Sequence, residues 1–314
     1  LAEKYPDDPK MQRDLYVQYG NLGNIAKARN DYKAAEGYYA KDLEISEKLA
    51  EKYPDDPNLQ SDLSVSYNKL GDIAKALKDY NAAEGYYAKA LEIRKRLAEK
   101  YPDDPNLQRN LSVSYNKLGY VAEARNDYKA AEAYCSKTLE IFEKLAEKYP
   151  DDPGMQRDLC VSYNNLGGIV KARNDYRAAE RHYAKALEIW ERLAEKYPDD
   201  PNLQRGLCAS YNNLGDIAEA LNDYKAAEGY YAKALEISER LAENFPEVPM
   251  LKDDLAVSLF RCGTCSADGK FSSEQKAMLR SAAAIWEELY KQTGYELYAE
   301  RRKLAQKLLN RCSE

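Results

Sequence analysis

LAEKYPDDP, residues 1–9, is the stretch that decides the fold, because it returns along the whole chain. Four unchanged copies and one variant, LAENFPEVP, begin at Leu49, Leu97, Leu145, Leu193 and Leu241. Consecutive copies are 48 residues apart. A fixed period of roughly 20 to 50 residues is the signature of a solenoid of stacked structural units. We therefore expect an elongated repeat array rather than ordinary globular domains.

The second period shows how one unit is built. Asp56 is suited to cap a helix that begins at Pro57, since aspartate accepts hydrogen bonds from the first free N–H groups and proline lacks one. Apolar residues then recur at helical spacing up to Leu77. Asp79 can cap a second helix, which Tyr101 and the following proline end. Each unit is expected to be a helical hairpin, so the fold class is all-α.

Two columns of small residues, each with members 48 residues apart, mark where the two helices approach each other. The first column lies on the first helix and contains Gly23, Gly71, Gly119, Gly167, Gly215 and Gly263. The second column lies on the second helix and contains Ala35, Ala83, Ala131, Ala179 and Ala227. Glycine inside a helix costs about 1 kcal/mol, so its return in each unit needs a reason. We interpret both columns as packing contacts within the hairpin.

Composition agrees with a thin, layered body and excludes several classes of function. The 314 residues include 28 tyrosines against 4 phenylalanines, and 32% are charged. Tyrosine has a polar tip on an apolar body, which suits a core that lies near water everywhere. A net charge of −6 gives no general attraction to nucleic acid or anionic lipid. No apolar run is long enough for a transmembrane helix, so we expect no membrane partner.

Few residues offer chemistry. The six cysteines are scattered at Cys135, Cys160, Cys208, Cys262, Cys265 and Cys312. This scatter predicts a reducing, cytoplasmic compartment rather than a disulfide framework. Cys262 and Cys265 form a CxxC pair, but both are expected within a helix at core positions, and the single histidine, His182, falls in a tyrosine column. We expect no catalytic residue, metal site or cofactor, and hence no enzyme.

The repeated motif resembles a known family. Tyr67-Asn68-Lys69-Leu70-Gly71, followed by Asp79-Tyr80, Ala83, Tyr87 and Ala90-Leu91-Glu92, is similar to the tetratricopeptide repeat, although the unit is longer than the usual 34 residues. The SYNNLG form resembles kinesin light chains and long-repeat bacterial proteins. The resemblance implies a right-handed α-solenoid whose concave groove binds proteins. It also implies a recognition or sensor region beside a signalling or effector module such as a caspase-like, TIR or NTPase domain.

The repeat sets the expected boundaries. Residues 1–8 are interpreted as the tail of a truncated preceding repeat, and residues 9–248 as five repeats. Residues 249–294 form a degenerate sixth repeat, and residues 295–314 a C-terminal capping helix. Because the chain opens inside a repeat, we expect a missing N-terminal region, faster fraying at that end and possible end-to-end self-association.

The first helices carry the candidate binding surface. At 100° per residue, Asn68 lies about 160° from Leu70, which faces the core. The candidate groove residues are Asn21, Asn68, Asn116, Asn164, Asn165, Asn212 and Asn213, with Asp72, Lys75, Tyr120 and Asp216 one turn further on. Asparagine is a mediocre helix former, so its recurrence indicates a ladder of amides for an extended peptide backbone. The alternative is that duplication copied these residues without a role.

We therefore expect a bacterial, cytoplasmic scaffold that binds a protein or peptide, with a part in signalling. One alternative is a scaffold for self-assembly. A second is nucleic-acid binding, which is less favoured because the candidate face mixes Lys27, Lys75, Glu123 and Glu219 instead of being basic. The carboxylate clamp of chaperone-binding arrays is not expected, because its lysine pattern is absent.

Overall fold

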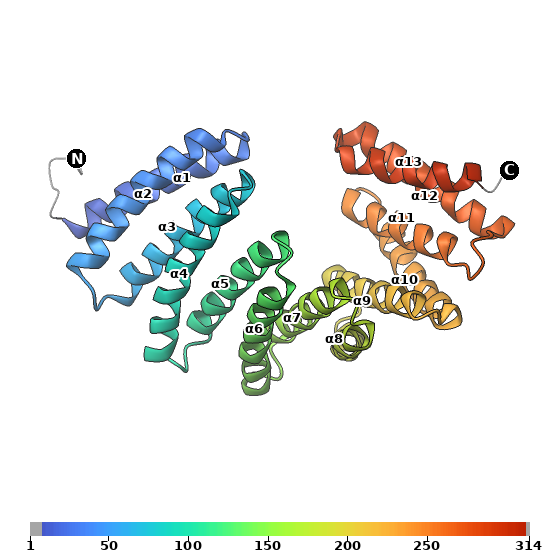
Figure 1. Cartoon of the computed structure of the whole chain (residues 1–314), viewed down its shortest axis with the longest axis horizontal. Coiled ribbons are helices and arrows are strands. Elements are labelled where there is room, and N and C mark those ends of the chain that lie inside the picture. Colours follow the sequence, from blue (N-terminus) through green and yellow to red (C-terminus); the bar gives the residue numbers. More distant parts are fainter. Residues whose placement is uncertain (1–7, 312–314) are drawn as a thin grey trace. The chain divides into compact units, whose positions relative to one another are not determined.

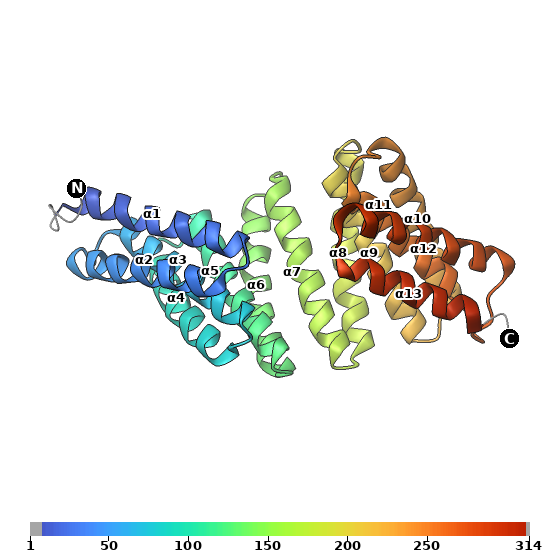
Figure 2. The same ribbon diagram turned by 90° about the horizontal axis from the view of Figure 1, so that it is seen from above.

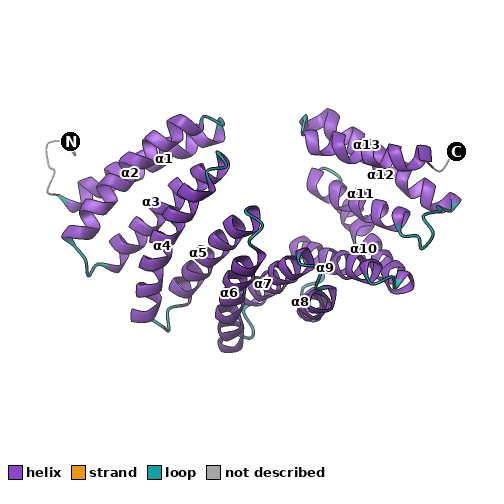
Figure 3. Cartoon of the chain, in the orientation of Figure 1, coloured by secondary structure: helices purple, strands orange, loops and turns teal. Residues whose placement is uncertain are grey.

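The structure is a computed structural model that describes residues 8–311, within which it contains thirteen α-helices and no strand (Figures 1 and 3). The helices are α1 (Pro9–Ala28), α2 (Tyr32–Lys52), α3 (Pro57–Ala76), α4 (Tyr80–Lys100), α5 (Pro105–Ala124), α6 (Tyr128–Lys148), α7 (Pro153–Ala172), α8 (Tyr176–Lys196), α9 (Pro201–Ala220), α10 (Tyr224–Asn244), α11 (Pro249–Thr264), α12 (Ser273–Thr293) and α13 (Glu296–Arg311). Odd-numbered helices up to α11 each begin at a proline, at intervals of 48 residues. The predicted all-α stack of hairpins is confirmed.

The chain forms two compact units, residues 1–148 and 149–314. The first unit consists of the hairpins α1–α2, α3–α4 and α5–α6, which stack in that order (Figure 2). The second unit consists of α7–α8, α9–α10 and α11–α12, with α13 packed on α12. The grouping of repeats into domains predicted from the sequence stays a prediction. The predicted tail at Leu1 to Tyr5, and Cys312, lie outside the described residues.

The helix starts and turns follow from local chemistry. At α3, the carboxylate of Asp56 accepts the backbone N–H groups of Asn58 (2.8 Å) and Leu59 (3.3 Å). At the hairpin turn, the N–H of Asp79 donates to the carbonyl of Ala74 (2.8 Å), which closes the end of α3. The same Asp79 side chain then accepts the N–H of Ala82 (3.0 Å) and caps α4. Both predicted N-caps are confirmed.

One residue in each regular turn adopts the left-handed conformation. These residues are Asn30, Lys78, Asn126, Asn174 and Asn222, with φ between 59° and 63°. Asparagine tolerates this region better than other side chains with a Cβ atom, so four of the five turns use it. Lys78 has the same backbone geometry without that advantage.

The glycine column closes four of the hairpins around a tyrosine ring. A Cβ atom on Gly71 would lie 2.4 Å from Cε1 of Tyr87, which no real contact allows, so only glycine fits there. Gly23, Gly167 and Gly215 lie equally close to Tyr39, Tyr183 and Tyr231. In α5–α6 the tyrosine is replaced by Cys135, and a Cβ atom on Gly119 would lie an ordinary 3.6 Å from its sulfur. Gly119 is therefore not needed for packing.

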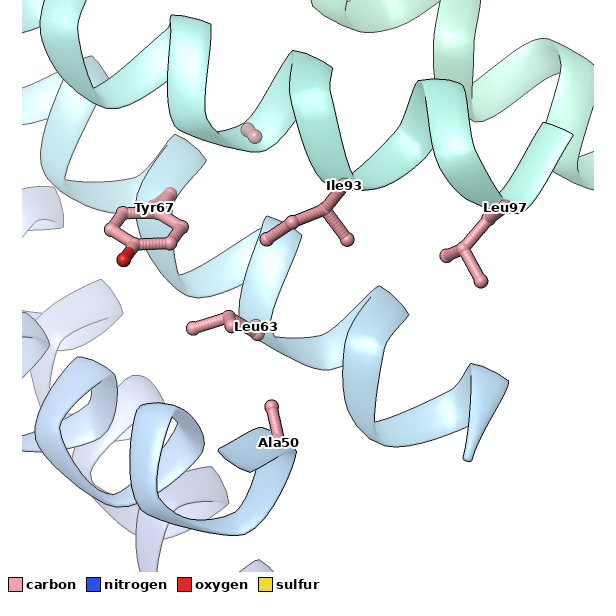
Figure 4. Packing of buried hydrophobic residues seen from close by; sticks show 6 residues of the cluster. Ala50, Leu63, Tyr67, Ile93 and Leu97 are labelled. Carbon is pink, nitrogen blue, oxygen red and sulfur yellow. The ribbon is translucent and has the colours of Figure 1, made fainter. Parts of the chain in front are cut away.

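Neighbouring hairpins bury a thin apolar layer between them. In the first unit, Ala50, Leu63, Tyr67, Ala90, Ile93 and Leu97 form one such cluster (Figure 4). Burying an aliphatic side chain of this size contributes about 1.5–3 kcal/mol. The ring of Tyr67 lies in the layer while its hydroxyl donates to the carboxylate of Glu47 (2.6 Å). Tyrosine therefore suits a core that is only one layer from solvent.

The sixth hairpin departs from the pattern. Its first helix, α11, has 16 residues rather than 20 and ends at Thr264, so Cys265 is a C-cap and not a residue within the helix. The prediction that both cysteines lie within a helix is therefore wrong for Cys265. A capping box starts α12, with Ser272 and Gln275 exchanging hydrogen bonds.

Candidate functional site

The asparagine column lies deeper than the sequence predicted. The side chains of Asn68 and Asn212 are only 6% and 7% exposed, so the expectation that they stand on the open face is wrong for both. The next hairpin contacts Asn212, whose amide nitrogen lies 3.4 Å from the Ser258 hydroxyl on α11. Asn116, Asn164, Asn165 and Asn213 are half-buried, and Asn21 is exposed. Their role in binding stays a prediction.

The exposed line on the first helices is instead a column of small apolar residues. Val65 is 40% exposed, and its column, which we call the valine face, contains Val17, Val65 and Val113 in the first unit and Val161, Ala209 and Val257 in the second. Val65 precedes Asn68 by three positions, which is about 60° around the helix. The open side of the first helices is therefore lined by this column and not by Asn68 and Asn212.

Asp72 is the centre of an ion-pair cluster in the first unit. Its carboxylate accepts Lys117 Nζ of α5 (2.5 Å) and the Tyr87 hydroxyl of α4 (2.6 Å), and Lys27 Nζ of α1 lies 3.9 Å away. Burial raises the pKa of Asp72, but these hydrogen bonds and charges outweigh it, so its pKa lies below the usual value. Asp72 therefore holds three helices together and is not a free ligand group.

Two further predicted residues meet beside this cluster. The ammonium of Lys75 on α3 lies 5.7 Å from the ring centre of Tyr120 on α5, within the range of a cation–π contact. Both side chains are exposed.

Asp216 repeats the same arrangement in the second unit. Arg261 of α11 binds it with two hydrogen bonds (2.7 and 2.9 Å), and Lys171 Nζ of α7 lies at 3.0 Å. The Tyr231 hydroxyl lies 3.1 Å from Asp216 and 3.0 Å from Glu219. Burial raises the pKa of Asp216, but the hydrogen bonds and charges of Arg261 and Lys171 lower it by more. The pKa of Asp216 therefore lies below its usual value.

A cavity of about 380 Å³ opens beside Asp216, and we call it the aromatic pocket. It is lined by Asp216, Glu219, Tyr231, Val257, Phe260, Arg261, Thr264, Trp286, Arg301 and Leu304. The rings of Phe260 and Trp286 lie 5.6 Å apart. Trp286 Nε1 donates to Asp253 (2.8 Å), and Arg301 binds the same carboxylate (2.5 and 2.8 Å) while it lies over the Trp286 ring. These bonds fix the rings in place.

A smaller cavity of about 160 Å³, which we call the amide pocket, adjoins it and shares Val257 and Arg261. Its other lining residues are Arg205, Cys208, Ala209, Asn212, Asn213 and Asp254. The side-chain oxygen of Asn212 has no hydrogen-bond partner among the described residues. Leaving a buried amide oxygen without a partner costs about 1–3 kcal/mol. The structure thus brings the predicted Asn212, Asn213 and Asp216 together.

Most residues of the aromatic pocket were missed by the sequence reasoning, which regarded the sixth repeat as degenerate. Phe260 occupies the column of Asn68 and departs from it, whereas Trp286 shares its column with two other aromatic residues, Phe142 and Trp190. The signal for Phe260 is departure from the repeat, and the signal for Trp286 is the aromatic column itself. Asn164 and Asn165 line neither pocket, and the first unit's Asn21, Asn68 and Asn116 belong to a different unit.

The structure offers no site for redox or metal chemistry in the part of the chain it describes. Burial raises the pKa of the Cys262 thiol to about 12 and that of Cys265 to about 11, away from the range of reactive thiols. Across residues 8–311, no three His, Cys, Asp or Glu side chains gather as a metal ion would require. No helix in this range is long and apolar enough to cross a bilayer.

Comparisons with known proteins identify the repeat. Family models described as tetratricopeptide repeat match residues 18–58, 62–144 and 158–240. No curated protein matches the sequence.

Among solved structures, BtubC (BKLC) from P. vanneervenii is 23% identical with a TM-score of 0.63, covering 84% of this chain and 93% of that one. Aspartyl phosphate phosphatase F from Bacillus subtilis is 13% identical with a TM-score of 0.63, covering 99% of this chain and 74% of that one. A putative kinesin light chain from Podospora anserina with nearly identical TPR-like repeats is 13% identical with a TM-score of 0.55, covering 74% and 98%. At these identities the likeness shows the fold.

Proposed function

Because the chain belongs to the tetratricopeptide repeat family, we propose that it is a protein-interaction scaffold that binds a peptide segment at the two adjoining pockets of its second unit. The observation that carries this proposal is the Asn212 amide. Asn212 lines the amide pocket, its buried oxygen has no partner among the described residues, and the aromatic pocket begins at the shared side chains Val257 and Arg261. An amide that can donate and accept suits the backbone of an extended peptide.

The two pockets would bind different parts of the peptide, the amide pocket its backbone and the aromatic pocket one side chain. The amide pocket supplies Asn212 and Asn213 for backbone contacts. The larger aromatic pocket has the volume for one large side chain beside Phe260 and the exposed Leu304. Burying one such side chain contributes about 1.5–3 kcal/mol, and each amide hydrogen bond about 0.5–1.5 kcal/mol. Together these contributions suit a moderate-affinity peptide ligand.

The resemblance to bacterial long-repeat arrays supports a finer proposal. We infer that this array is the recognition region of a larger cytoplasmic signalling or effector protein, in which peptide binding at the second unit reports the presence of a partner. No catalytic role is assigned to the array, since its titratable clusters are ion pairs that join helices.

The test is selection of peptides from a random displayed library by the full chain. We expect Asn212→Ala to weaken the selected peptides about 3- to 10-fold, because one or two hydrogen bonds are lost. Leu304→Asp, which changes an exposed wall of the aromatic pocket, should weaken them about 10-fold or more.

The matched controls are Asn164→Ala, in the same column but lining neither pocket, and Gln306→Asp, exposed on α13 outside the pocket. Both controls should bind as the wild type does. Equal binding by Asn212→Ala, Leu304→Asp and the controls would place the peptide elsewhere and overturn the proposal.

A second candidate function, end-to-end association, has its own observation. Leu22 on α1 is 42% exposed, whereas Leu70, the same column on α3, is 4% exposed because the preceding hairpin covers it. Ile25 and Ile73 differ in the same way. We propose that this α1 face stacks on a hairpin of another copy. Light scattering at several concentrations tests it: Leu22→Glu with Ile25→Glu should remove any concentration-dependent increase in mass, and a monomer at all concentrations would reject it.

A further inference from the structure

The charges around the aromatic pocket are unevenly paired. Four charged residues line it, and three of them have ion-pair partners: Asp216 with Arg261, and Arg301 with Asp253. Glu219 has no cation within ion-pair distance among the described residues. Its one bond is from the Tyr231 hydroxyl, which lies as close to Asp216. A single hydroxyl proton can serve only one of these two carboxylates at a time.

The first unit contains the same cluster with the opposite charge at this position. Asp72, Lys27, Lys117 and Tyr87 correspond to Asp216, Lys171, Arg261 and Tyr231. The residue one turn after the aspartate is Lys75 in the first unit and Glu219 in the second. An acid three positions after Asp216 places like charges on one helix face, which is unfavourable unless a cation joins them. This charge reversal lies beside the aromatic pocket.

The apolar lining decides which cation fits. Val257, Phe260 and Leu304 offer carbon surface in the pocket that Glu219 also lines, and the buried Trp286 ring packs against Phe260. A lysine or arginine side chain has an apolar stem with a charged head, so it matches both parts at once. An isolated inorganic cation would leave the rings unused, and a purely apolar side chain would leave Glu219 without a partner.

We propose that the aromatic pocket takes a lysine or arginine side chain of the bound peptide, whose stem packs against Phe260 and Leu304 and whose charged head binds Glu219. This inference rests on the proposed peptide-binding function of the same unit. It assigns Glu219 as the specificity-determining residue of the pocket.

The test compares peptides that differ in charge alone. Peptides selected by the wild type at low salt should carry an enriched basic residue at one position. Replacing that residue with norleucine, which keeps the stem and removes the charge, should weaken binding about 10-fold, measured by calorimetry. The weakening should shrink at high salt, because ion pairs are screened.

Protein variants complete the test. Glu219→Gln keeps an oxygen for the Tyr231 hydroxyl, so the fold is retained, and it should bind the basic and norleucine peptides equally. Glu219→Lys should shift selection toward acidic residues. Glu236→Gln, exposed on α10 away from both pockets, is the matched control and should keep the basic preference.

Two negative results are distinguishable. If peptides bind and depend on Asn212 and Leu304, but show no basic preference or keep it in Glu219→Gln, the assignment of Glu219 is overturned while the proposed function stands. If selected peptides bind equally to wild type, Asn212→Ala and Leu304→Asp, both proposals are overturned.

Discussion

The second and third hairpins of the first unit, α3–α4 and α5–α6, have the same turns and caps but close in different ways. In the second hairpin the Tyr87 ring covers Gly71 and its hydroxyl reaches Asp72. In the third hairpin, Cys135 stands in place of Tyr87, and the residue in place of Asp72 is an aromatic one, Tyr120.

The second hairpin therefore has its tyrosine ring on the second helix, in the core, whereas the third hairpin has a tyrosine ring on the first helix, at the surface. Tyr87 is fully buried, whereas Tyr120 is 51% exposed and lies under the ammonium of Lys75. Gly119 is retained although nothing packs tightly against it. The difference teaches that a residue retained in a repeat column is required only where its partner is also present.

Replacing Gly71 or Gly119 with alanine should give the largest difference in stability between the two hairpins. Gly71→Ala forces Cβ into the Tyr87 ring, and we expect it to destabilise α3–α4 by about 3 kcal/mol, the upper part of the range for overpacked cores. Gly119→Ala makes only ordinary van der Waals contact with Cys135 and should stabilise α5–α6 by about 0.5–1 kcal/mol, since alanine favours a helix. Hydrogen exchange of each hairpin in the full chain measures both. Equal effects at the two sites would contradict the packing argument.

The hydroxyl of Tyr87 should have the next largest effect. Tyr87→Phe keeps the ring over Gly71 but removes the donor to Asp72, at a cost of about 1.5–2 kcal/mol for a hydrogen bond to a charged group. Urea unfolding monitored by circular dichroism gives the change. Cys135→Ala in the third hairpin, which removes no such donor, is the control, and a smaller loss in Tyr87→Phe than in this control would be against the prediction.

The turns offer a smaller, reciprocal comparison. Lys78 has φ of 62° and Asn126 has φ of 60°. Lys78→Asn should stabilise the second hairpin by about 0.5–1 kcal/mol, and Asn126→Lys should destabilise the third by a similar amount. Thermal melting of both variants checks the signs. A change of the same sign in both turns would show that the backbone conformation does not decide the preference.

Lowering the pH should give the smallest difference in stability between the hairpins. The pKa of Asp72 is lower in the folded chain than in the unfolded chain. Its contribution is therefore complete above the unfolded pKa, near 4, and is lost as the pH falls through the lower folded value. Burial opposes the ion pairs, so the shift is modest. Unfolding midpoints at pH 5 and pH 3 should fall less in Asp72→Asn than in the wild type, and a parallel fall in both would exclude Asp72 as a contributor.

Much of the fold was predictable because it is decided locally. The period, the caps Asp56 and Asp79, and the approach at Gly71 each depend on residues close in sequence or on the partner helix of one hairpin. The binding surface was less predictable. A helical wheel gives the angle of Asn68 on its own helix but not the extent to which the next hairpin covers it.

The two pockets could not be predicted from the sequence for a different reason. Columns show what the repeats share, while the aromatic pocket also needs Phe260, which departs from the column of Asn68, and Leu304 on α13. Their meeting depends on the stacking of three helices, which no single repeat contains. The predicted Asn212 and Asp216 entered the site because they line its edge.

The double use of the turn aspartate limits how such an array can change in length. Asp79 closes α3 with its backbone N–H and caps α4 with its side chain, so no residue lies between the end of one bond pattern and the start of the next. One inserted residue would separate the two bonds and rotate every following side chain by about 100° around its helix. The link of residues 265–272 is longer, and there Ser272 rather than an aspartate caps α12. The distance in sequence between the two helices of a hairpin is thus fixed by one aspartate in the turn between them.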